Sequence, residues 1–437
     1  MKFRSITITT LIFILSTTCQ NSDDSDITNP SPQTEKPNIL LIIADDMGLD
    51  ATPNYNIGSV KPNMPNLQAM MNTGIRFNNF WSNPTCTPTR GSIITGKYGF
   101  RTGVTEVGDV MPLSEVSLQS HLDNTNTGYS HAVVGKWHLA NNDASHPTNM
   151  GIGYYAGLLS GGVQSYTSWN LTENQQTTTS SEYTTTKFTD LAINWVDQQT
   201  QPWFLWLAYN APHTPFHLPP SNLHSLGSLP TDQASIDANP LPYYMAMLEA
   251  MDTEIGNLLS SMSHTERENT VIIFIGDNGT PGETAQDYLS SRAKGSIFNG
   301  GINVPMIISG KDVTRVNAVE NALINSTDLF ATISELAGNS TPEINDSKSF
   351  KDLLSSTNAN RREYIYAERG PIGAQDYTVR NSTHKYMYFD NGNERLFNLS
   401  TDPFENTNLL NVNQLPLSQD DSDALNELID RVNEIRN

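Results

Sequence analysis

The sequence Asn38-Ile-Leu-Leu-Ile-Ile-Ala44, followed at once by Asp45-Asp46, indicates the fold of this chain. An unbroken run of aliphatic and β-branched residues is typical of a strand buried on both faces, which occurs in parallel sheets covered by helices on each side. The two aspartates stand just past the carboxyl end of this strand, where open α/β sheets place ligands. A simple turn or helix cap is the alternative interpretation of a bare Asp-Asp pair.

Further apolar runs end in polar or ionisable clusters in the same way. The runs are Ser130–Gly135, followed by Lys136-Trp137-His138; Trp203–Tyr209, followed by Asn210 to Pro215; and Val271–Ile275, followed by Gly276-Asp277-Asn278-Gly279. Helical patterns at Phe188–Gln199, Tyr244–Met262 and Asp328–Gly338 alternate with them. This alternation predicts an α/β fold with a doubly wound, mostly parallel central sheet flanked by helices, and places the polar clusters along one edge of the sheet.

The pattern changes near Phe350. Short strands are predicted at Arg362–Ala367, Tyr377–Arg380 and Lys385–Phe389, and an amphipathic helix at Asp423–Ile435. We therefore expect a main domain over residues 37–349 and a smaller C-terminal subdomain, residues 350–437, with a short antiparallel sheet. Two segments rich in Gly, Ser, Thr or Pro, Asn141–Thr186 and Leu218–Leu241, are predicted to be loops, either over the mouth of a pocket or elsewhere on the surface.

The N-terminal segment is interpreted as a targeting signal and kept out of the fold. Residues 1–19 combine a basic start, a short apolar run at Ile6–Leu15 and Cys19, and so resemble a bacterial lipoprotein signal in which Cys19 is lipidated. Residues 20–36, rich in Ser, Asp, Asn and Pro, are predicted to be a disordered tether. An ordinary secretory signal with an incidental cysteine is the alternative. We expect an exported protein: a lipoprotein of the outer membrane or cell surface, or otherwise a periplasmic or secreted one.

Composition narrows the possible partners. The formal net charge of −21 argues against nucleic acid, which requires a basic surface. The chain has 2 cysteines, Cys19 and Cys86, so no disulfide is expected once the signal has been removed. The only membrane contact that we expect is the lipid anchor.

The stretch Cys86-Thr-Pro-Thr-Arg90-Gly-Ser-Ile-Ile-Thr-Gly96 predicts a turn followed by a helix. Pro88 is compatible with the first helical turn, where its missing N–H is not needed. Cys86 would then lie at the positive N-terminal end of the helix, which favours anionic ligands. A buried cysteine acting only as a small apolar residue is the alternative.

Oxygen-bearing, basic and imidazole side chains follow the predicted strands. Asp45, Asp46, Asp277 and Asn278 form an all-oxygen set that suits a hard divalent cation, calcium rather than zinc. Lys136 and Lys294 are candidate charges for a tetrahedral anion, and His138 and His213 can move protons near neutral pH. Each residue taken alone has an ordinary structural interpretation.

In this order and spacing, the motifs resemble those of the type I, formylglycine-dependent sulfatases of the alkaline-phosphatase-like superfamily, in particular exported bacterial enzymes that act on polysaccharide or aryl sulfates. The specific part is Cys86-x-Pro88-x-Arg90 followed by Thr95-Gly96, and the resemblance extends from about Asn38 to about Leu410. It includes Gly300-Gly301 and a tail motif from Leu396 to Leu409.

The resemblance implies a nucleophile and a metal site. Cys86 would be converted to formylglycine (3-oxoalanine) by a formylglycine-generating enzyme. One Ca²⁺ would be held by the oxygen set together with the modified Cys86. Arg90 would hold the formylglycine hydroxyls, and Lys136 and Lys294 would bind sulfate oxygens.

The resemblance also implies the proton transfers and the reaction. His213 would protonate the leaving alcohol, with Lys294 as a possible helper, and His138 would take the proton whose removal frees sulfate. The chain departs from the family at Asn299 and Asn303, where glutamate and arginine are usual, which weakens the expected support of Lys294. We expect a sulfuric ester hydrolase acting on a sulfated carbohydrate, a polysaccharide or its oligosaccharides. The alternatives are a phosphate or phosphonate ester hydrolase on the same scaffold and a catalytically silent carbohydrate-binding lipoprotein.

Overall fold

A large mixed sheet forms the centre of the computed structural model, which describes residues 36–357 and 362–437. Within these residues the sheet has ten strands in the order β11-β2-β10-β9-β1-β8-β4-β5-β6-β7. Its central strands run parallel: β9 (Thr270–Gly276), β1 (Asn38–Ala44), β8 (Trp203–Ala208), β4 (Ser130–Lys136) and β5 (Tyr154–Leu158). The prediction of a mostly parallel α/β sheet is confirmed. The predicted signal, including Cys19, lies outside the described residues.

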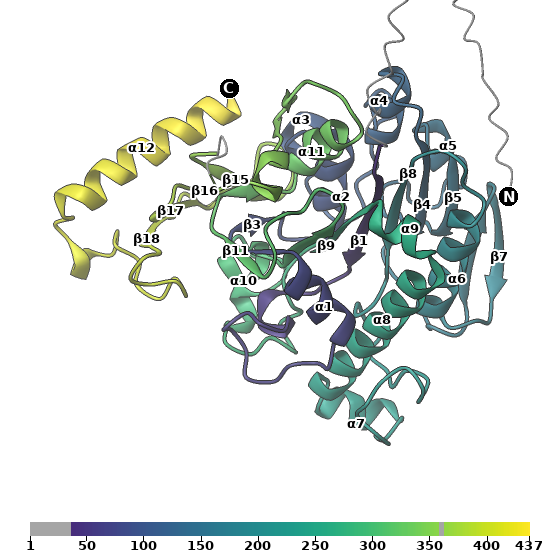
Figure 1. The fold of residues 1–437 in the computed structure, drawn as a ribbon. Coiled ribbons are helices and arrows are strands. Elements are labelled where there is room, and N and C mark those ends of the chain that lie inside the picture. Colours follow the sequence, from purple (N-terminus) through teal and green to yellow (C-terminus); the bar gives the residue numbers. More distant parts are fainter. Residues whose placement is uncertain (1–35, 358–361) are drawn as a thin grey trace, which may run out of the picture. The chain divides into compact units, whose positions relative to one another are not determined.

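Strand β1 shows why this sheet has helices on both faces. Every residue of β1 is buried, and its side chains alternate between two apolar cores, Leu40 and Ile42 entering one and Leu41 and Ile43 the other. Helices α1 (Pro65–Thr73), α6 (Thr184–Val196) and α8 (Leu241–Ser261) contribute to the first core, and α2 (Cys86–Thr95), α4 (Leu118–Asn124) and α11 (Asp328–Leu336) to the second. The result is a layer of helices on each side of the sheet (Figure 1).

The remaining strands extend the sheet at its two edges. Towards one edge, β10 (Met306–Gly310) pairs antiparallel with β9 and with β2 (Ile75–Phe77), and β11 (Ala318–Glu320) follows. At the other edge, β6 (Trp169–Glu173) and β7 (Gln176–Ser180) form an antiparallel hairpin next to β5.

This hairpin corrects the prediction that Asn141–Thr186 is only a loop. The segment also contains β5 and the short helix α5 (His146–Asn149). Its threonine run is β-branched and suits a strand, and Trp169 and Leu171 are buried in the core. The second predicted loop, Leu218–Leu241, contains helix α7 (Gln233–Ala238), which is capped by the Asp232 carboxylate accepting from Ser235 N at 3.0 Å.

The C-terminal residues form the predicted small antiparallel sheet. Its strands are β15 (Ile365–Arg369), β16 (Asp376–Arg380), β17 (His384–Tyr388) and β18 (Glu394–Asn398), the last of which the sequence pattern missed. Helix α12 (Gln419–Arg436) packs on this sheet through Leu428 and Val432 (Figure 1). A small core that includes Trp81 and Ile365 joins β15 to segments before residue 350.

Shorter elements complete the described chain. They are β3 (Phe80–Trp81), β12 (Ile324–Asn325), β13 (Glu343–Ile344), β14 (Ser347–Lys348), α3 (Gly99–Thr102), α9 (His264–Glu268), α10 (Asn299–Ile302) and the 3₁₀ turns η1 (Leu49–Ala51), η2 (Ser290–Arg292), η3 (Lys351–Leu354) and η4 (Val412–Gln414). None of the helices described here is both long and apolar enough to cross a membrane.

Candidate active site

The predicted metal ligands meet where strands β1 and β9 end. Ala44 and Gly276 are partners in the parallel register, so Asp45 and Asp277 leave the sheet side by side. Backbone pairing continues past the strands, because Asp277 N donates to Ala44 O at 3.1 Å. Asp46 N then donates to the Asp277 carboxylate at 3.0 Å. The predicted convergence of these carboxylates at one sheet edge is thus present in the structure.

Helix α2 carries Cys86 to the same place. The helix begins at Cys86 and ends at Thr95, and its C-cap Gly96 has a left-handed φ of 65°. Every residue of the helix is buried, so packing fixes its position. Cys86 Sγ lies 3.2 Å from His138 Nδ1. Burial raises the pKa of the Cys86 thiol, so the unmodified side chain is a protonated, poorly nucleophilic thiol.

Arg90, on the next turn of α2, ties the helix to the strand ends. The side chain is fully buried, and its Nε and Nη2 donate to Asp277 Oδ2 at 3.2 and 2.8 Å. Its Nη1 donates to Lys136 O at 2.7 Å. A planar guanidinium suits this arrangement, because it can bind a carboxylate and a carbonyl at once.

The two lysines pair with the first two aspartates. Lys136 Nζ lies 2.5 Å from Asp45 Oδ2, and Lys294 Nζ lies 2.5 Å from Asp46 Oδ2. His213 Nε2 lies 3.9 Å from the same Asp46 oxygen. All the residues predicted for the site therefore gather around the carboxylates of Asp45 and Asp46.

Burial and neighbouring charges shift the proton affinities of these groups. Burial acts to raise the pKa of Asp46, but the positive charges of Lys294, His213 and Lys136 outweigh it and hold that pKa well below its usual range. Burial, with help from Asp45, raises the pKa of Asp277. Such opposed shifts between adjacent carboxyls are common at functional sites.

Unsatisfied oxygens indicate that this cluster can bind a cation. Among the described residues, Asp45 Oδ1 and Asn278 Oδ1 are buried without a hydrogen-bond partner. One ligand atom from each of Asp45, Cys86 and Asp277 can be chosen so that all lie within 4.8 Å of one another. A buried acceptor without a donor is unfavourable, and a bound hard cation removes that penalty. The residues present therefore fit a calcium ion.

Two site residues adopt backbone conformations that are rare for them. Asp46 has φ 73° and His138 has φ 59°, both in the left-handed region. Strained conformations of this kind persist where surrounding contacts enforce them, and they cluster at functional sites.

Burial lowers the pKa of His138 to about 2, and the charges of Lys136 and Arg90 act in the same direction. The imidazole of His138 is therefore neutral.

The segment after β5 contains site residues that sequence reasoning missed. His138 N donates to Leu159 O at 3.1 Å, so the pairing of β4 with β5 continues up to this segment. A Cβ added to Gly161 would lie 2.4 Å from Nε2 of His138, and one added to Gly162 would lie 3.2 Å from Cε1 of His213. The available signal was the adjacent pair of glycines, which follows β5 after Leu159 and Ser160. They let the backbone contact both histidines.

Asn210 is a second residue that the sequence did not single out. Its side chain is buried, and neither amide atom has a hydrogen-bond partner among the described residues. Tyr166 OH lies 2.8 Å from Asn210 O and 2.6 Å from His213 O, and its one proton is shared between these two carbonyls of the turn that presents His213. Burial lowers the pKa of His213 to about 4, although the charge of Asp46 opposes this shift.

The substitutions at Asn299 and Asn303 are balanced by charges from elsewhere in the chain. Lys385 on β17 pairs with the buried Glu405 at 2.5 Å, and Glu405 also accepts from Asn299 N at 2.7 Å. A buried ion pair from the C-terminal part of the chain thus anchors helix α10, which begins at Asn299.

Known sulfatases are similar to this chain along most of its length. The model of the family named Sulfatase matches residues 37–339, and the model named N-sulphoglucosamine sulphohydrolase, C-terminal, matches residues 292–434. Arylsulfatase G of Rattus norvegicus is 27% identical over 424 residues, which cover 82% of this chain and 76% of the relative.

Solved structures share the fold. Ps i-CgsB is similar with a TM-score of 0.76 and 26% identity, over 91% of this chain and 92% of that one. BT4656, in complex with its substrate D-glucosamine-2-N,6-O-disulfate, is similar with a TM-score of 0.75 and 20% identity, over 92% of this chain and 98% of that one. The first family model covers most of the chain and both strand ends that carry the acidic cluster, and we conclude that the chain belongs to the sulfatase family of enzymes.

Proposed function

We propose that this enzyme removes sulfate from a sulfated carbohydrate, using a formylglycine made from Cys86 and one calcium ion. The observation that carries the proposal is the buried cluster in which Asp45, Asp277 and Cys86 offer ligand atoms within 4.8 Å of one another. Asp45, Asp46, Asp277 and Asn278 would hold the ion together with the modified Cys86. Bound calcium supplies positive charge that offsets the carboxylates and polarises a sulfate oxygen.

The nucleophile depends on maturation of Cys86. Oxidation by a formylglycine-generating enzyme gives an aldehyde, whose hydrate supplies the hydroxyl that attacks sulfur. The N-terminus of α2 places this side chain where helix N–H groups favour an anion. Arg90, held by Asp277 and Lys136 O, fixes the helix relative to the acidic cluster and brings a permanent charge next to it.

The basic residues neutralise and orient the sulfate. Lys136 and Lys294 each donate to one aspartate, and each ammonium has further protons that can bond to a sulfate oxygen. Burial acts to lower the pKa of Lys294, but the carboxylates of Asp46 and Asp45 outweigh it and hold that pKa above its ordinary value. Lys294 therefore stays protonated beside the leaving oxygen.

The histidines would move protons at the two ends of the reaction. His138 is neutral and its Nδ1 lies 3.2 Å from Cys86 Sγ, so this nitrogen would take the proton of the second formylglycine hydroxyl, whose removal frees sulfate. His213 shares the Asp46 carboxylate with Lys294. Its Nδ1 donates to Thr214 O at 2.9 Å, so the protonated ring would give the leaving sugar oxygen a proton from Nε2, with Lys294 Nζ as the alternative donor.

The carbohydrate substrate rests on similarity to known proteins. Ps i-CgsB has also been solved in complex with k-i-k-neocarrahexaose, and the substrate of BT4656 is a disulfated glucosamine. Export as a lipoprotein, with Cys19 lipidated, would bring such an enzyme to polysaccharides outside the cell. Metabolic labelling with a fatty acid tests the anchor: label on the wild type and none on Cys19→Ala supports it, and equal label on both refutes it.

The deciding experiment combines mass spectrometry with turnover. Protein co-produced with a formylglycine-generating enzyme should show the mass change of oxidation at Cys86 and release sulfate from sulfated glycans only with calcium. A Cys86→Ala variant serves as control. Modified protein that releases phosphate but not sulfate would refute the proposal in favour of a phosphohydrolase. Full modification without turnover of either ester would point to a binding protein.

Proton donation to the leaving oxygen has its own test. The alcohol of para-nitrophenyl sulfate leaves readily without a proton, whereas a sugar hydroxyl does not. We expect His213→Ala to lower kcat on a sugar sulfate at least about tenfold more than on para-nitrophenyl sulfate, because general acid catalysis contributes about 10²–10⁴-fold. Equal losses on the two substrates would show that His213 is not the proton donor.

A further inference from the structure

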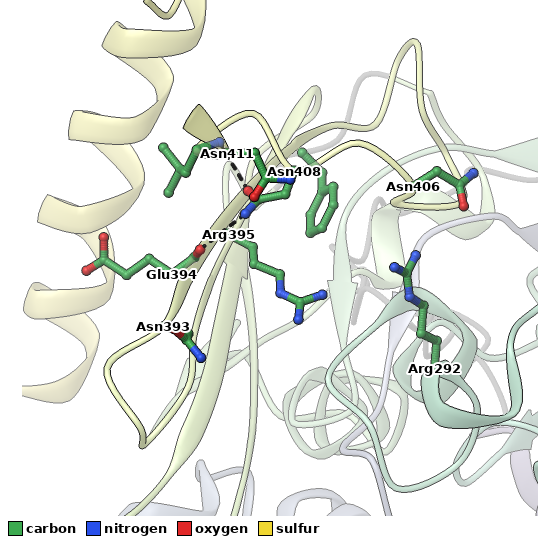
Figure 2. A pocket seen from close by; sticks show the side chains of 9 residues that line it. Arg292, Asn393, Glu394, Arg395, Asn406, Asn408 and Asn411 are labelled. Carbon is green, nitrogen blue, oxygen red and sulfur yellow. Dashed lines mark hydrogen bonds between the residues drawn. The ribbon is translucent and has the colours of Figure 1, made fainter. Parts of the chain in front are cut away.

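A cavity of about 510 Å³ lies beside strand β18, outside the cluster of carboxylates described above. Its wall is formed by β18, by the segment that follows β18 and by Arg292 at the end of η2 (Figure 2). The lining is polar and rich in amides, with two arginines and one phenylalanine, Phe397, among its residues. The charged lining residues are Arg292, Arg395 and Glu394, so the cavity is positive on a chain whose net charge is −21.

The two arginines point into the same space from opposite walls (Figure 2). Arg292 Nη1 donates to Glu405 O at 2.7 Å, and its guanidinium lies 4.7 Å from the Phe298 ring centre. The guanidinium of Arg395 lies 5.3 Å from Phe298 and 5.0 Å from Phe389. The rings hold both guanidinium groups in place and leave several N–H donors directed at the cavity.

Arg395 makes no direct contact with a counter-charge in the described part of the chain. Within residues 36–357 and 362–437 its guanidinium makes these ring contacts but no hydrogen bond or ion pair. Burial lowers the pKa of Arg395 and the nearby charge of Arg292 lowers it further, while the charge of Glu405 opposes both effects. Glu394 does not compensate, because its carboxylate turns away from Arg395, as alternation along a strand requires (Figure 2). Two partly buried cations that face one cavity repel each other, and an anion bound between them would relieve that repulsion.

The neighbouring amides suit a sugar. Asn393, Asn406, Asn408 and Asn411 line the cavity. Amide groups both donate to and accept from hydroxyls, which are the main polar groups of a sugar. The combination of two guanidinium groups with several amides therefore matches a sugar unit that carries a sulfate group better than it matches a bare inorganic anion.

One residue of the cavity is close in the sequence to a proposed catalytic residue. Arg292 precedes Lys294 by two positions, so their Cα atoms are at most about 7 Å apart. The segment is held on both sides, since Gly295 N donates to Pro84 O at 2.8 Å and Arg292 bonds to Glu405 O. One wall of the cavity is therefore the segment that presents Lys294 to Asp46.

We propose that this cavity is a second saccharide subsite, which binds the sulfate group of a sugar unit other than the one that is desulfated. Arg395 and Arg292 bind the sulfate oxygens. The amides of Asn393, Asn406 and Asn411 bind ring hydroxyls, whereas the Asn408 amide is already bonded to the backbone of Glu394, Leu396 and Leu410. The proposal rests on the proposed function, because it requires a sulfated oligosaccharide as substrate. It adds a preference for chains that carry more than one sulfate.

The test compares Arg395→Gln with a matched control, Arg431→Gln. Arg431 also lies over a ring, Tyr364 at 4.4 Å, but pairs with Glu434 at 2.9 Å and lies outside the cavity. Calorimetry on the Cys86→Ala background measures binding of carrageenan and heparin hexasaccharides, of their desulfated forms and of inorganic sulfate. We expect Arg395→Gln to weaken binding of a sulfated hexasaccharide about tenfold to a hundredfold, as for a lost hydrogen bond to a charged group.

The outcomes separate this proposal from the proposed function. Sulfate release from para-nitrophenyl sulfate tests the reaction without using the cavity. If Arg395→Gln weakens binding of inorganic sulfate but not of any hexasaccharide, the cavity is an anion site and not a saccharide subsite. If Arg395→Gln and Arg431→Gln bind every hexasaccharide equally well, or if the desulfated forms show the same loss, the proposal is wrong.

Discussion

The substitution Gly161→Ala tests whether the segment after β5 fixes the imidazole of His138. A Cβ at position 161 would lie 2.4 Å from Cε1 and Nε2 of His138 and 3.1 Å from its Cδ2. Carbon and nitrogen atoms in ordinary contact are separated by about 3.5–4.0 Å. The imidazole must therefore move by about 1 Å or the loop must lift, and either change alters the 3.2 Å approach of His138 Nδ1 to Cys86.

The magnitude follows from this displacement. Misplacing a catalytic group by 1 Å lowers the rate about 10²-fold, so kcat/KM should fall about a hundredfold. Stability should change little, because the contact is with a side chain at the site and not with the backbone of the sheet. The neighbouring Gly162→Ala is a graded control: its Cβ would lie 3.2 Å from His213 Cε1, which requires a shift of only a few tenths of an ångström.

The assay is sulfate release by proteins whose formylglycine content has been matched by mass spectrometry, together with thermal unfolding. We expect a loss of about a hundredfold for Gly161→Ala, a loss of about threefold or less for Gly162→Ala, and similar Tm values for both. A Gly161→Ala enzyme with kcat/KM within about threefold of the wild type would refute the idea that this segment positions His138.

Three further predictions concern the metal, a buried ion pair and pH. Dialysis against EGTA should abolish sulfate release and lower the Tm, and calcium but not zinc should restore both; more than half the activity left after EGTA would contradict a calcium site. Glu405→Gln leaves Lys385 buried without its counter-charge, so the free energy of unfolding measured with denaturant should fall by about 3 kcal/mol. A fall below about 1 kcal/mol would contradict the view that this ion pair stabilises the fold. Burial lowers the pKa of His217 from 6.5 to about 4, so the unfolded chain takes up its proton between pH 6.5 and 4 while the folded chain does not. The free energy of unfolding should therefore fall as pH decreases through this window, by at most about 3 kcal/mol from this group. His217→Gln should reduce the slope of unfolding free energy against pH, whereas the exposed control His264→Gln should not.

The central strands could be predicted because their continuous apolar sequences are stable only when both faces of the strand are buried. The run at Asn38–Ala44 is apolar at every position after Asn38, and β1 is indeed buried throughout between two layers of helices. Parallel strands end at the same edge of a sheet, so the polar clusters that follow each strand were expected to meet. Local chemistry along the chain was enough to place Asp45, Asp277 and Lys136 together.

Edge strands were harder, since their residues face water on one side and carry a weaker pattern. The threonine-rich run that became β7 resembles a loop in composition, although its β-branched side chains suit a strand next to β6. Strand β18 was missed because Glu394–Asn398 is short and has polar ends. In both cases pairing with a neighbouring strand, and not the local sequence, decided the structure.

The sequence by itself determined the sheet, the helix at Cys86 and the set of side chains that form the acidic cluster, since these depend on burial patterns and on residues that directly follow strands. Only the tertiary structure decided which charges pair and which surfaces meet. Three such contacts join different segments of the chain. They are the ion pair of Lys385 with Glu405, the close approach of Gly161 to His138, and the cavity shared by Arg292 and Arg395. Such contacts leave no periodic signal, because they arise from the packing of whole elements and not from the preferences of neighbouring residues.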